Sequence, residues 1–345
     1  MTCVAIIGGG LAGCASAYEL AKKGINTVII EKSNNIGGKV INYGCKATNA
    51  CNNCGLCLVK DLWEKVKERS EISILTNAIA VDMEGEKGNY KITVKENGKT
   101  RVINNIDSVI VSTGFDNFSL VSLSNLEMDK ISNVITGSKL EEIIAHRDGD
   151  PLFEGLLPHE PSNIAFIQCF GSRDLKERAD YCSRVCCGYS TRMAKVIHWY
   201  YPNAKITIFY MDLQWVGEKN YFSDLINTGI EFIMCKPVEI IGGVSGTSTA
   251  KIKYEDLQFD GVSEREFDVV VLSEGIHACS DSYAAAEIFG LKQDKNGFLK
   301  HVIDPLISGV YVAGCAGGPK RIEEVYAESA SIAREIWYSL MKINS

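Results

Sequence analysis

Short apolar runs, separated by a helical pattern, open the chain and predict a strand–helix–strand unit. Residues Val4–Ile7 are apolar without interruption, as in a parallel strand that is buried on both faces. A helical pattern continues to about Lys23, Gly24 breaks it, and a second apolar run covers Thr27–Ile30. The pattern therefore predicts two parallel strands joined by a helix.

A glycine-rich turn lies between the first strand and the helix. It reads Gly8-Gly9-Gly10-Leu11-Ala12-Gly13 and matches G-x-G-x-x-G. In this motif the first glycine allows a tight turn, the second lets the backbone approach a pyrophosphate, and the third lets the helix pack closely. Glu31 ends the second strand and can accept hydrogen bonds from ribose hydroxyls. The combination predicts a dinucleotide site rather than a glycine-rich turn without a ligand.

Later segments repeat the buried-strand pattern. One covers Ser108–Val111 and ends in Ser112-Thr113-Gly114, and another covers 309–314 before a helix expected over about 321–341. A strand is expected at 163–167, and residues 251–268 alternate as in a meander of strands.

The segment after Glu31 resembles a sequence motif of a known protein superfamily. Lys32 to Lys39, with Gly37 and Gly38, is similar to the E-K-x(4)-G-G extension of the two-dinucleotide-binding flavoproteins, which include thioredoxin reductase. The resemblance implies FAD and an α/β fold in which an FAD-binding Rossmann-type domain is interrupted by a second, smaller α/β domain. It implies that FAD contacts the turn, the extension and the later strands, through Gly8, Gly10, Leu11, Ala12, Gly13, Glu31, Lys32, Gly37, Gly38, Lys39, Thr113, Gly114, Gly314, Cys315, Lys320 and Ile322.

The domain limits follow from the same resemblance. We expect the FAD-binding domain over 1–124 and 279–345, with a cysteine-rich insertion at 40–60, and the second domain over 125–278. In most relatives an Asp follows the late glycine and holds the ribityl chain, whereas Cys315 stands there in this chain.

Composition narrows the class of protein. The 345 residues carry a net charge of −7, which argues against nucleic acid and anionic membranes as partners. The N-terminus has no basic region typical of a signal peptide, and no apolar run reaches the length of a membrane span, so we expect a cytoplasmic protein. The 13 cysteines then indicate metal ligands or redox chemistry more than structural disulfides.

The second domain lacks the fingerprint of a nicotinamide site. After the strand at 163–167 the chain reads Gln168-Cys169-Phe170-Gly171-Ser172-Arg173-Asp174, which has one glycine. Cysteines follow, and the four spaced C-x12-C-x3-C-C match the ligand number of an iron–sulfur cluster. Zinc, a disulfide or buried core cysteines remain alternatives. The four are Cys169, Cys182, Cys186 and Cys187.

The same segments resemble the A subunits of heterodisulfide reductases and their shorter relatives. The matching stretches are 168–173, 181–187 and 313–320, together with the N-terminal fingerprint. The resemblance implies a 4Fe–4S cluster on the four cysteines beside FAD. Full-length members carry further ferredoxin-like domains, and many carry a Lys where this chain has Arg192. Because Arg keeps the charge but does not serve as a proton donor, this difference favours simple electron relay over bifurcation. Arg192 and Cys315 are the candidate catalytic residues.

A second group of cysteines follows the first strand–helix–strand unit. Cys45, Cys51, Cys54 and Cys57 resemble half of a ferredoxin motif, with Asp61 where a further cysteine would stand. We expect a second cluster there, with zinc or a redox-active Cys51–Cys54 disulfide as alternatives.

These observations predict an oxidoreductase that passes electrons between FAD and iron–sulfur clusters. The resemblance implies other heterodisulfide-reductase-like subunits or ferredoxin-like carriers as partners, a role in sulfur metabolism such as sulfur oxidation, and, from the superfamily, a homodimer. The alternatives are a free-standing dithiol/disulfide oxidoreductase that uses Cys51 and Cys54, and a non-catalytic assembly protein.

Overall fold

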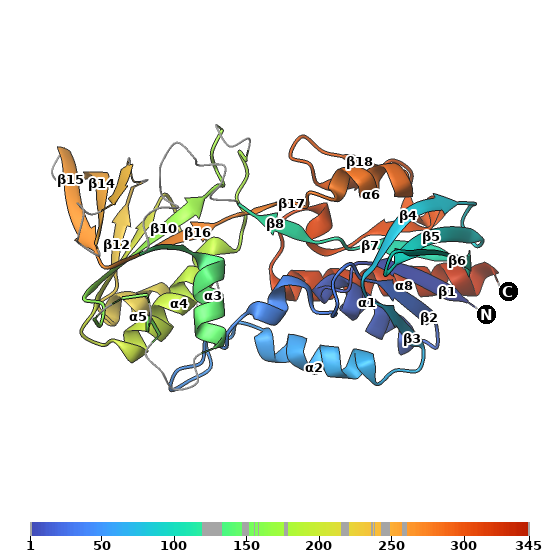
Figure 1. Ribbon diagram of the computed structural model, residues 1–345, viewed down its shortest axis with the longest axis horizontal. Helices are drawn as coiled ribbons and strands as arrows, with labels where there is room; N and C mark the ends of the chain where they lie inside the picture. Colours follow the sequence, from blue (N-terminus) through green and yellow to red (C-terminus); the bar gives the residue numbers. More distant parts are fainter. Residues whose placement is uncertain are drawn as a thin grey trace. The chain divides into compact units, whose positions relative to one another are not determined.

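The computed structural model describes most of the chain (Figure 1). The described residues are 2–118, 133–146, 152–154, 156–157, 159–175, 179–214, 221–235, 237, 239–242, 249–256 and 261–343. In this part of the chain, no helix is both long enough and apolar enough to cross a bilayer.

The chain divides into two compact units. The first contains residues 1–41, 55–116 and 277–345, and the second contains residues 42–54 and 117–276. Residues 42–54, which we expected in an insertion of the first domain, therefore cluster with the second unit. The expected boundary at 124/125 lies outside the described residues, and the domain limits stay a prediction.

A parallel sheet of order β20-β7-β1-β2-β3 forms the centre of the first unit. Its register aligns Ile7 of β1 with Ile30 of β2 and with Val111 of β7, so the strands end together. The sheet strands are β1 (Cys3–Ile7), β2 (Asn26–Ile30), β3 (Ile72–Leu75), β7 (Ser108–Val111) and β20 (Val310–Val312). The helices are α1 (Leu11–Ala21), α2 (Leu56–Lys67), α6 (Ser282–Phe289), α7 (Pro305–Ser308) and α8 (Ile322–Ile343).

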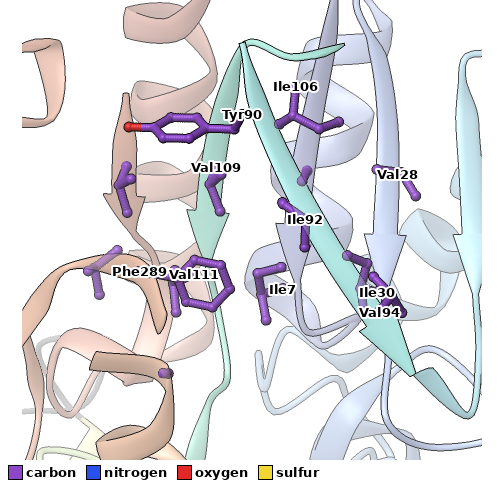
Figure 2. Packing of buried hydrophobic residues seen from close by; sticks show 14 of the residues in the cluster. Ile7, Val28, Ile30, Tyr90, Ile92, Val94, Ile106, Val109, Val111 and Phe289 are labelled. Atoms are coloured by element: carbon purple, nitrogen blue, oxygen red, sulfur yellow. The ribbon is translucent and has the colours of Figure 1, made fainter. Parts of the chain in front are cut away.

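An antiparallel sheet covers one face of this parallel sheet. Ile92 and Val94 of its central strand pack with Ile7 and Ile30, and Phe289 of α6 lies beside Val111 (Figure 2). The antiparallel strands are β4 (Ala78–Glu84), β5 (Tyr90–Glu96) and β6 (Lys99–Ile106), and a further pair is β18 (Leu291–Gln293) with β19 (Leu299–His301).

The second unit has its own parallel sheet, of order β12-β11-β10-β16-β9. The sheet strands are β9 (Val134–Thr136), β10 (Asn163–Phe170), β11 (Lys205–Tyr210), β12 (Glu231–Met234) and β16 (Val269–Glu274). The helices are α3 (Gly137–Ala145), α4 (Cys186–Tyr200) and α5 (Tyr221–Asn227), and β13 (Glu239–Gly242), β14 (Ala250–Asp256) and β15 (Gly261–Phe267) form the expected meander. Two short strands, β8 (Phe115–Asn117) and β17 (Ile276–Ala278), contain the points where the chain passes between the units.

Alternate residues of β10 face opposite layers of the second unit. Ile164 and Phe166 pack against α3 and α4, whereas Ala165 and Ile167 pack against β14 and β15. This alternation is the ordinary consequence of an extended strand. Both units thus have parallel sheets with helices, as the sequence predicts.

Candidate functional site

The glycine turn of the first unit has the tight geometry that the fingerprint predicts. Gly8 has φ of 102°, and a Cβ there would lie 2.5 Å from the carbonyl oxygen of Ser112. A Cβ on Gly13 would lie 2.0 Å from the carbonyl oxygen of Gly8. Because neither distance is possible for a real side chain, both positions require glycine.

The N-terminus of α1 opens beside a second glycine segment. Gly10 precedes Leu11 and Ala12, and among the described residues a Cβ on Gly10 would meet only the Cα of Gly38, at 3.8 Å. Gly37 donates from its N–H to Gly9 O at 2.8 Å, which holds the two segments together. The first turn of a helix carries N–H groups without intrahelical partners, so this end of α1 suits a phosphate group.

Glu31 lies directly beside this turn. Its carboxylate accepts from the backbone N–H of Gly9 at 2.6 Å and of Ser33 at 2.7 Å, and it is buried. The neighbouring cations have their own acidic partners, since Lys32 forms an ion pair with Asp281 and Lys39 lies 3.8 Å from Asp116.

Thr113 supplies an independent sign of a ligand in the first unit. Its hydroxyl is buried and has no hydrogen-bond partner among the described residues. It follows Ser112, whose carbonyl borders Gly8, and it precedes Gly114, which has φ of 79°. A buried polar atom without a partner is costly, so a bound group with a polar atom would stabilise this position. The glycine cradle and this hydroxyl together fit a dinucleotide.

The late strand ends against the same helix. Gly314 has φ of 67°, and a Cβ there would lie 2.7 Å from Ala12 Cβ. Lys320 donates to the carbonyl oxygen of Gly314 at 2.8 Å, and the N–H of Gly314 donates to the carboxylate of Glu328 at 2.7 Å. Ile322 is the first residue of α8, as the sequence leads us to expect within one residue.

Cys315 has the properties of a protonated thiol. Burial raises the pKa of Cys315 to about 11, and its Sγ lies 3.6 Å from the carbonyl oxygen of Lys320. Since thiolates are the reactive form of cysteine, this environment favours a backbone contact at Cys315 over thiol chemistry.

Three of the four predicted cluster ligands lie together in the second unit, and the fourth lies in the adjoining loop. Cys169 lies near the end of β10, where the pairing with β16 is irregular and its φ is 57°. Cys186 and Cys187 are the first two residues of α4, and they are buried together with Cys169. Cys182 lies in the loop that leads to α4 and is partly exposed.

The thiols influence one another strongly. A hydrogen bond with Cys186 lowers the pKa of Cys169 and lowers the pKa of Cys187 to about 7. The same contacts raise the pKa of Cys186, and burial raises that of Cys182. The contacts among the thiols thus favour the thiolate forms of Cys169 and Cys187, and the thiolate is the form that binds metal.

The loop between Cys169 and Cys182 is closed by backbone contacts. Arg173 donates from its N–H to the carbonyl oxygen of Tyr181 at 3.0 Å, and its guanidinium lies 2.7 Å from Asp212. Arg184 donates from its N–H to Cys182 Sγ at 3.3 Å. These contacts join the residue before Cys182 to Arg173 and place the Cys182 sulfur against the N–H of Arg184.

This donor set fits an iron–sulfur cluster in kind and number. Three of the four cysteines are buried together at one end of a parallel sheet, and the fourth, Cys182, lies in the loop that leads to α4. Within the described ranges, no group of three or more cysteine, histidine or carboxylate side chains has the spacing needed for a single metal ion. The cluster therefore stays a proposal that rests on the convergence of the thiols.

The second cysteine group is divided between the units. Cys45, Cys51 and Cys54 belong to the second unit, and Cys57 lies in α2 of the first. A second cluster on these four cysteines stays a prediction. Arg192 contacts the segment that carries this group, because its Nε donates to the carbonyl oxygen of Asn52 at 2.9 Å.

A buried ion pair anchors the same segment, and sequence reasoning missed it. Lys46 and Glu141 of α3 are 3% and 6% exposed and are in direct contact. Lys46 also donates to the carbonyl oxygen of Gly44 at 2.8 Å, and a Cβ on Gly44 would lie 2.5 Å from the backbone of Ala145. No local pattern signals this pair, since its partners are 95 residues apart.

The fold is that of thioredoxin reductases. The structure of thioredoxin reductase from T. acidophilum aligns with a TM-score of 0.64 at 18% identity, over 98% of each chain. The enzyme from Lactococcus lactis aligns with a TM-score of 0.63 at 16% identity, over 99% of this chain and 100% of that one. The family model for an NAD(P)-binding Rossmann-like domain matches residues 6–51. The predicted two-dinucleotide-binding fold is thus confirmed.

Sequence relatives cover nearly the whole chain. The A subunit of the Ferredoxin/F(420)H(2)-dependent CoB-CoM heterodisulfide reductase of Methanosarcina acetivorans is 26% identical over 96% of this chain and 52% of its own length. The A subunit of the H(2):CoB-CoM heterodisulfide,ferredoxin reductase of Methanothermobacter marburgensis is 26% identical over 98% of this chain and 64% of its own length. The chain therefore spans between half and two thirds of these relatives. The predicted resemblance to the A subunits of heterodisulfide reductases is confirmed along almost all of this sequence.

Proposed function

We propose that the chain is an oxidoreductase subunit that binds FAD in its first unit and an iron–sulfur cluster in its second. FAD exchanges electrons in pairs or singly, and a cluster carries one electron at a time. The convergence of Cys169, Cys186 and Cys187 at the end of β10 carries this proposal. In an open parallel sheet, ligands bind outside the carboxyl ends of the strands, which is where these thiols lie.

The residues of the first unit would hold FAD by its phosphates and ribose. The N-terminal turn of α1 would bind the diphosphate, with Gly8 and Gly13 keeping the backbone close. Glu31 would accept from ribose hydroxyls, and Thr113 would gain a partner for its unpaired hydroxyl.

The names of the relatives support a role within a complex. Both of them are A subunits of heterodisulfide reductases. By this likeness, partners would be similar subunits or ferredoxin-like carriers, in the cytoplasm and within sulfur metabolism such as sulfur oxidation. A homodimer would agree with the superfamily.

Anaerobic purification with cofactor analysis tests the proposal. We expect one FAD, with at least four iron and four sulfide per chain. Cys182→Ser should lose iron and sulfide while keeping FAD. Cys235→Ser is the matched control, because Cys235 is a partly exposed cysteine of the same unit outside both cysteine groups, and its iron should equal that of the wild type. Equal iron in both variants would refute the four-cysteine site.

The Cys51–Cys54 dithiol remains a second candidate function. Cys51 is exposed and Cys54 is partly buried, as an attacking and a resolving thiol would be. In that case Cys51→Ser would abolish the reduction of a small disulfide while the iron content stayed unchanged. A non-catalytic assembly role would instead leave the bound flavin resistant to reduction by dithionite.

A further inference from the structure

Two residues close to Cys169 in the sequence carry buried polar atoms that have no hydrogen-bond partner among the described residues. Gln168 is 3% exposed, and both its amide nitrogen and its amide oxygen lack a hydrogen bond within the described part of the chain. The hydroxyl of Ser172, which is fully buried, is also unpaired among these residues. Such atoms are rare in proteins because a buried polar atom without a hydrogen bond destabilises the folded state. Three of them beside one cysteine indicate that a further polar group belongs at this place.

Gln168 lies at the end of β10, directly before Cys169. Ile164 and Phe166 of this strand pack toward α4, and the pairing with β16 becomes irregular after Ile167. In β16, the hydroxyl of Ser273 lies 2.8 Å from the hydroxyl of Ser190 in α4. Gln168 is therefore the residue next to Cys169 at the end of the sheet where α4 begins with two cysteines.

The turn after β10 brings Ser172 to the same place. Its N–H donates to the carbonyl oxygen of Cys169 at 3.1 Å, so the turn folds back on the cysteine. A Cβ on Gly275 would lie 2.5 Å from Ser183 Oγ and 3.1 Å from Ser172 Oγ, so both serines lie close to the backbone of Gly275. The Ser172 hydroxyl is thus buried at the end of the sheet.

We propose that Gln168 and Ser172 donate hydrogen bonds to the sulfur-rich, anionic group held by the four cysteines, and thereby favour its reduced form. This inference rests on the proposed function. Amide and hydroxyl donors near a cluster stabilise the extra negative charge of the reduced state and raise its potential. Gln168 and Ser172 would then be residues that tune the cluster without binding iron.

Gln168→Met tests the proposal in two forms of the protein, since Met has a similar volume and no donor. In the iron-loaded protein, we expect unchanged iron content and about a tenfold shift of the reduction equilibrium toward the oxidised form, which is about 59 mV for one electron. In protein freed of iron by a chelator, we expect Gln168→Met to leave the denaturant midpoint unchanged or to raise it. The variant changes the reduction equilibrium without lowering the stability of the iron-free protein, because the amide has a hydrogen-bond partner only when the cluster is bound.

A second donor variant and a control variant complete the test. Ser172→Ala should shift the reduction equilibrium in the same direction by a smaller factor. Ser190→Ala is the control, because its hydroxyl already pairs with Ser273, so it should lower stability in both forms and leave the potential in place.

An unchanged potential in Gln168→Met with full iron content would overturn the inference. A clear loss of stability of the iron-free variant would also overturn it, since the amide would then have a protein or water partner. Wild-type protein without iron would instead refute the proposed function, and the inference with it.

Discussion

The guanidinium of Arg192 donates from Nε to the carbonyl oxygen of Asn52, 140 residues earlier in the chain. Arg192 lies in α4, the helix that begins with Cys186 and Cys187. Asn52 lies between Cys51 and Cys54. One helix therefore carries two of the predicted cluster ligands and also holds the second cysteine segment. Arg192 is thus a positioning residue in this structure.

Replacing Arg192 should loosen residues 42–54. A hydrogen bond from a charged donor contributes about 1.5–3 kcal/mol, so Arg192→Leu should speed hydrogen exchange in this segment by at least about tenfold. Exchange measured by mass spectrometry gives the readout. Trp199→Gln changes an exposed residue of the same helix and should leave the exchange unchanged. Equal exchange in the two variants would show that the contact has no structural role.

The buried pair of Lys46 and Glu141 should be costly to break on one side only. Lys46→Met should lower the free energy of unfolding by about 3–5 kcal/mol, because it leaves a buried carboxylate without its partner. The double variant with Glu141→Leu should recover most of this loss. Urea unfolding of the three proteins measures both effects, and additive losses would contradict the account.

Glycine at position 13 of the first turn should be required for FAD binding. Gly13→Ala should remove FAD from the purified protein, because the added Cβ would meet the carbonyl oxygen of Gly8. Gly24→Ala is the matched control, since Gly24 has φ of 72° but no atom within 4 Å of an added Cβ among the described residues. It should cost about 1 kcal/mol and keep FAD. Flavin absorbance per chain measures both, and full flavin in Gly13→Ala would be incompatible with the proposed site.

The thiol of Cys315 should remain protonated at pH values where ordinary cysteines react. Burial raises its pKa from 9.0 to about 11, so the folded protein favours the neutral form of this thiol. The stability that the neutral thiol contributes to the folded state is therefore lost as the pH rises from about 9 to about 11. Alkylation of Cys315 by iodoacetamide, followed by peptide mass spectrometry, should still accelerate about tenfold between pH 9 and 10. A rate that levels off near pH 9 would contradict the assignment.

Local patterns predicted the strands and helices, and the two-domain fold followed from the resemblance that their motifs carry. The apolar runs at β1, β2 and β7 and the glycines of the first turn carry their information within a few residues, and the structure has these elements at the expected places. The first cysteine group was recognisable because its spacing is short and its ligand number is familiar.

Contacts between distant segments could not be predicted in the same way. The pair Lys46–Glu141 joins a loop to a helix, and neither neighbourhood has a pattern that marks the other. The positive φ of Cys169 was also unexpected, because a non-glycine residue adopts it only when the surrounding structure requires it. The missing hydrogen-bond partners of the Gln168 amide could not be predicted either, because they are recognised only when the burial of the side chain is known.

Electron paramagnetic resonance of the anaerobically purified protein after dithionite reduction shows whether the four cysteines hold an iron–sulfur cluster. We expect a signal from a reduced iron–sulfur cluster that is lost in Cys182→Ser and retained in Cys235→Ser. A yellow protein that is free of iron, gives no such signal and oxidises NAD(P)H directly would contradict it.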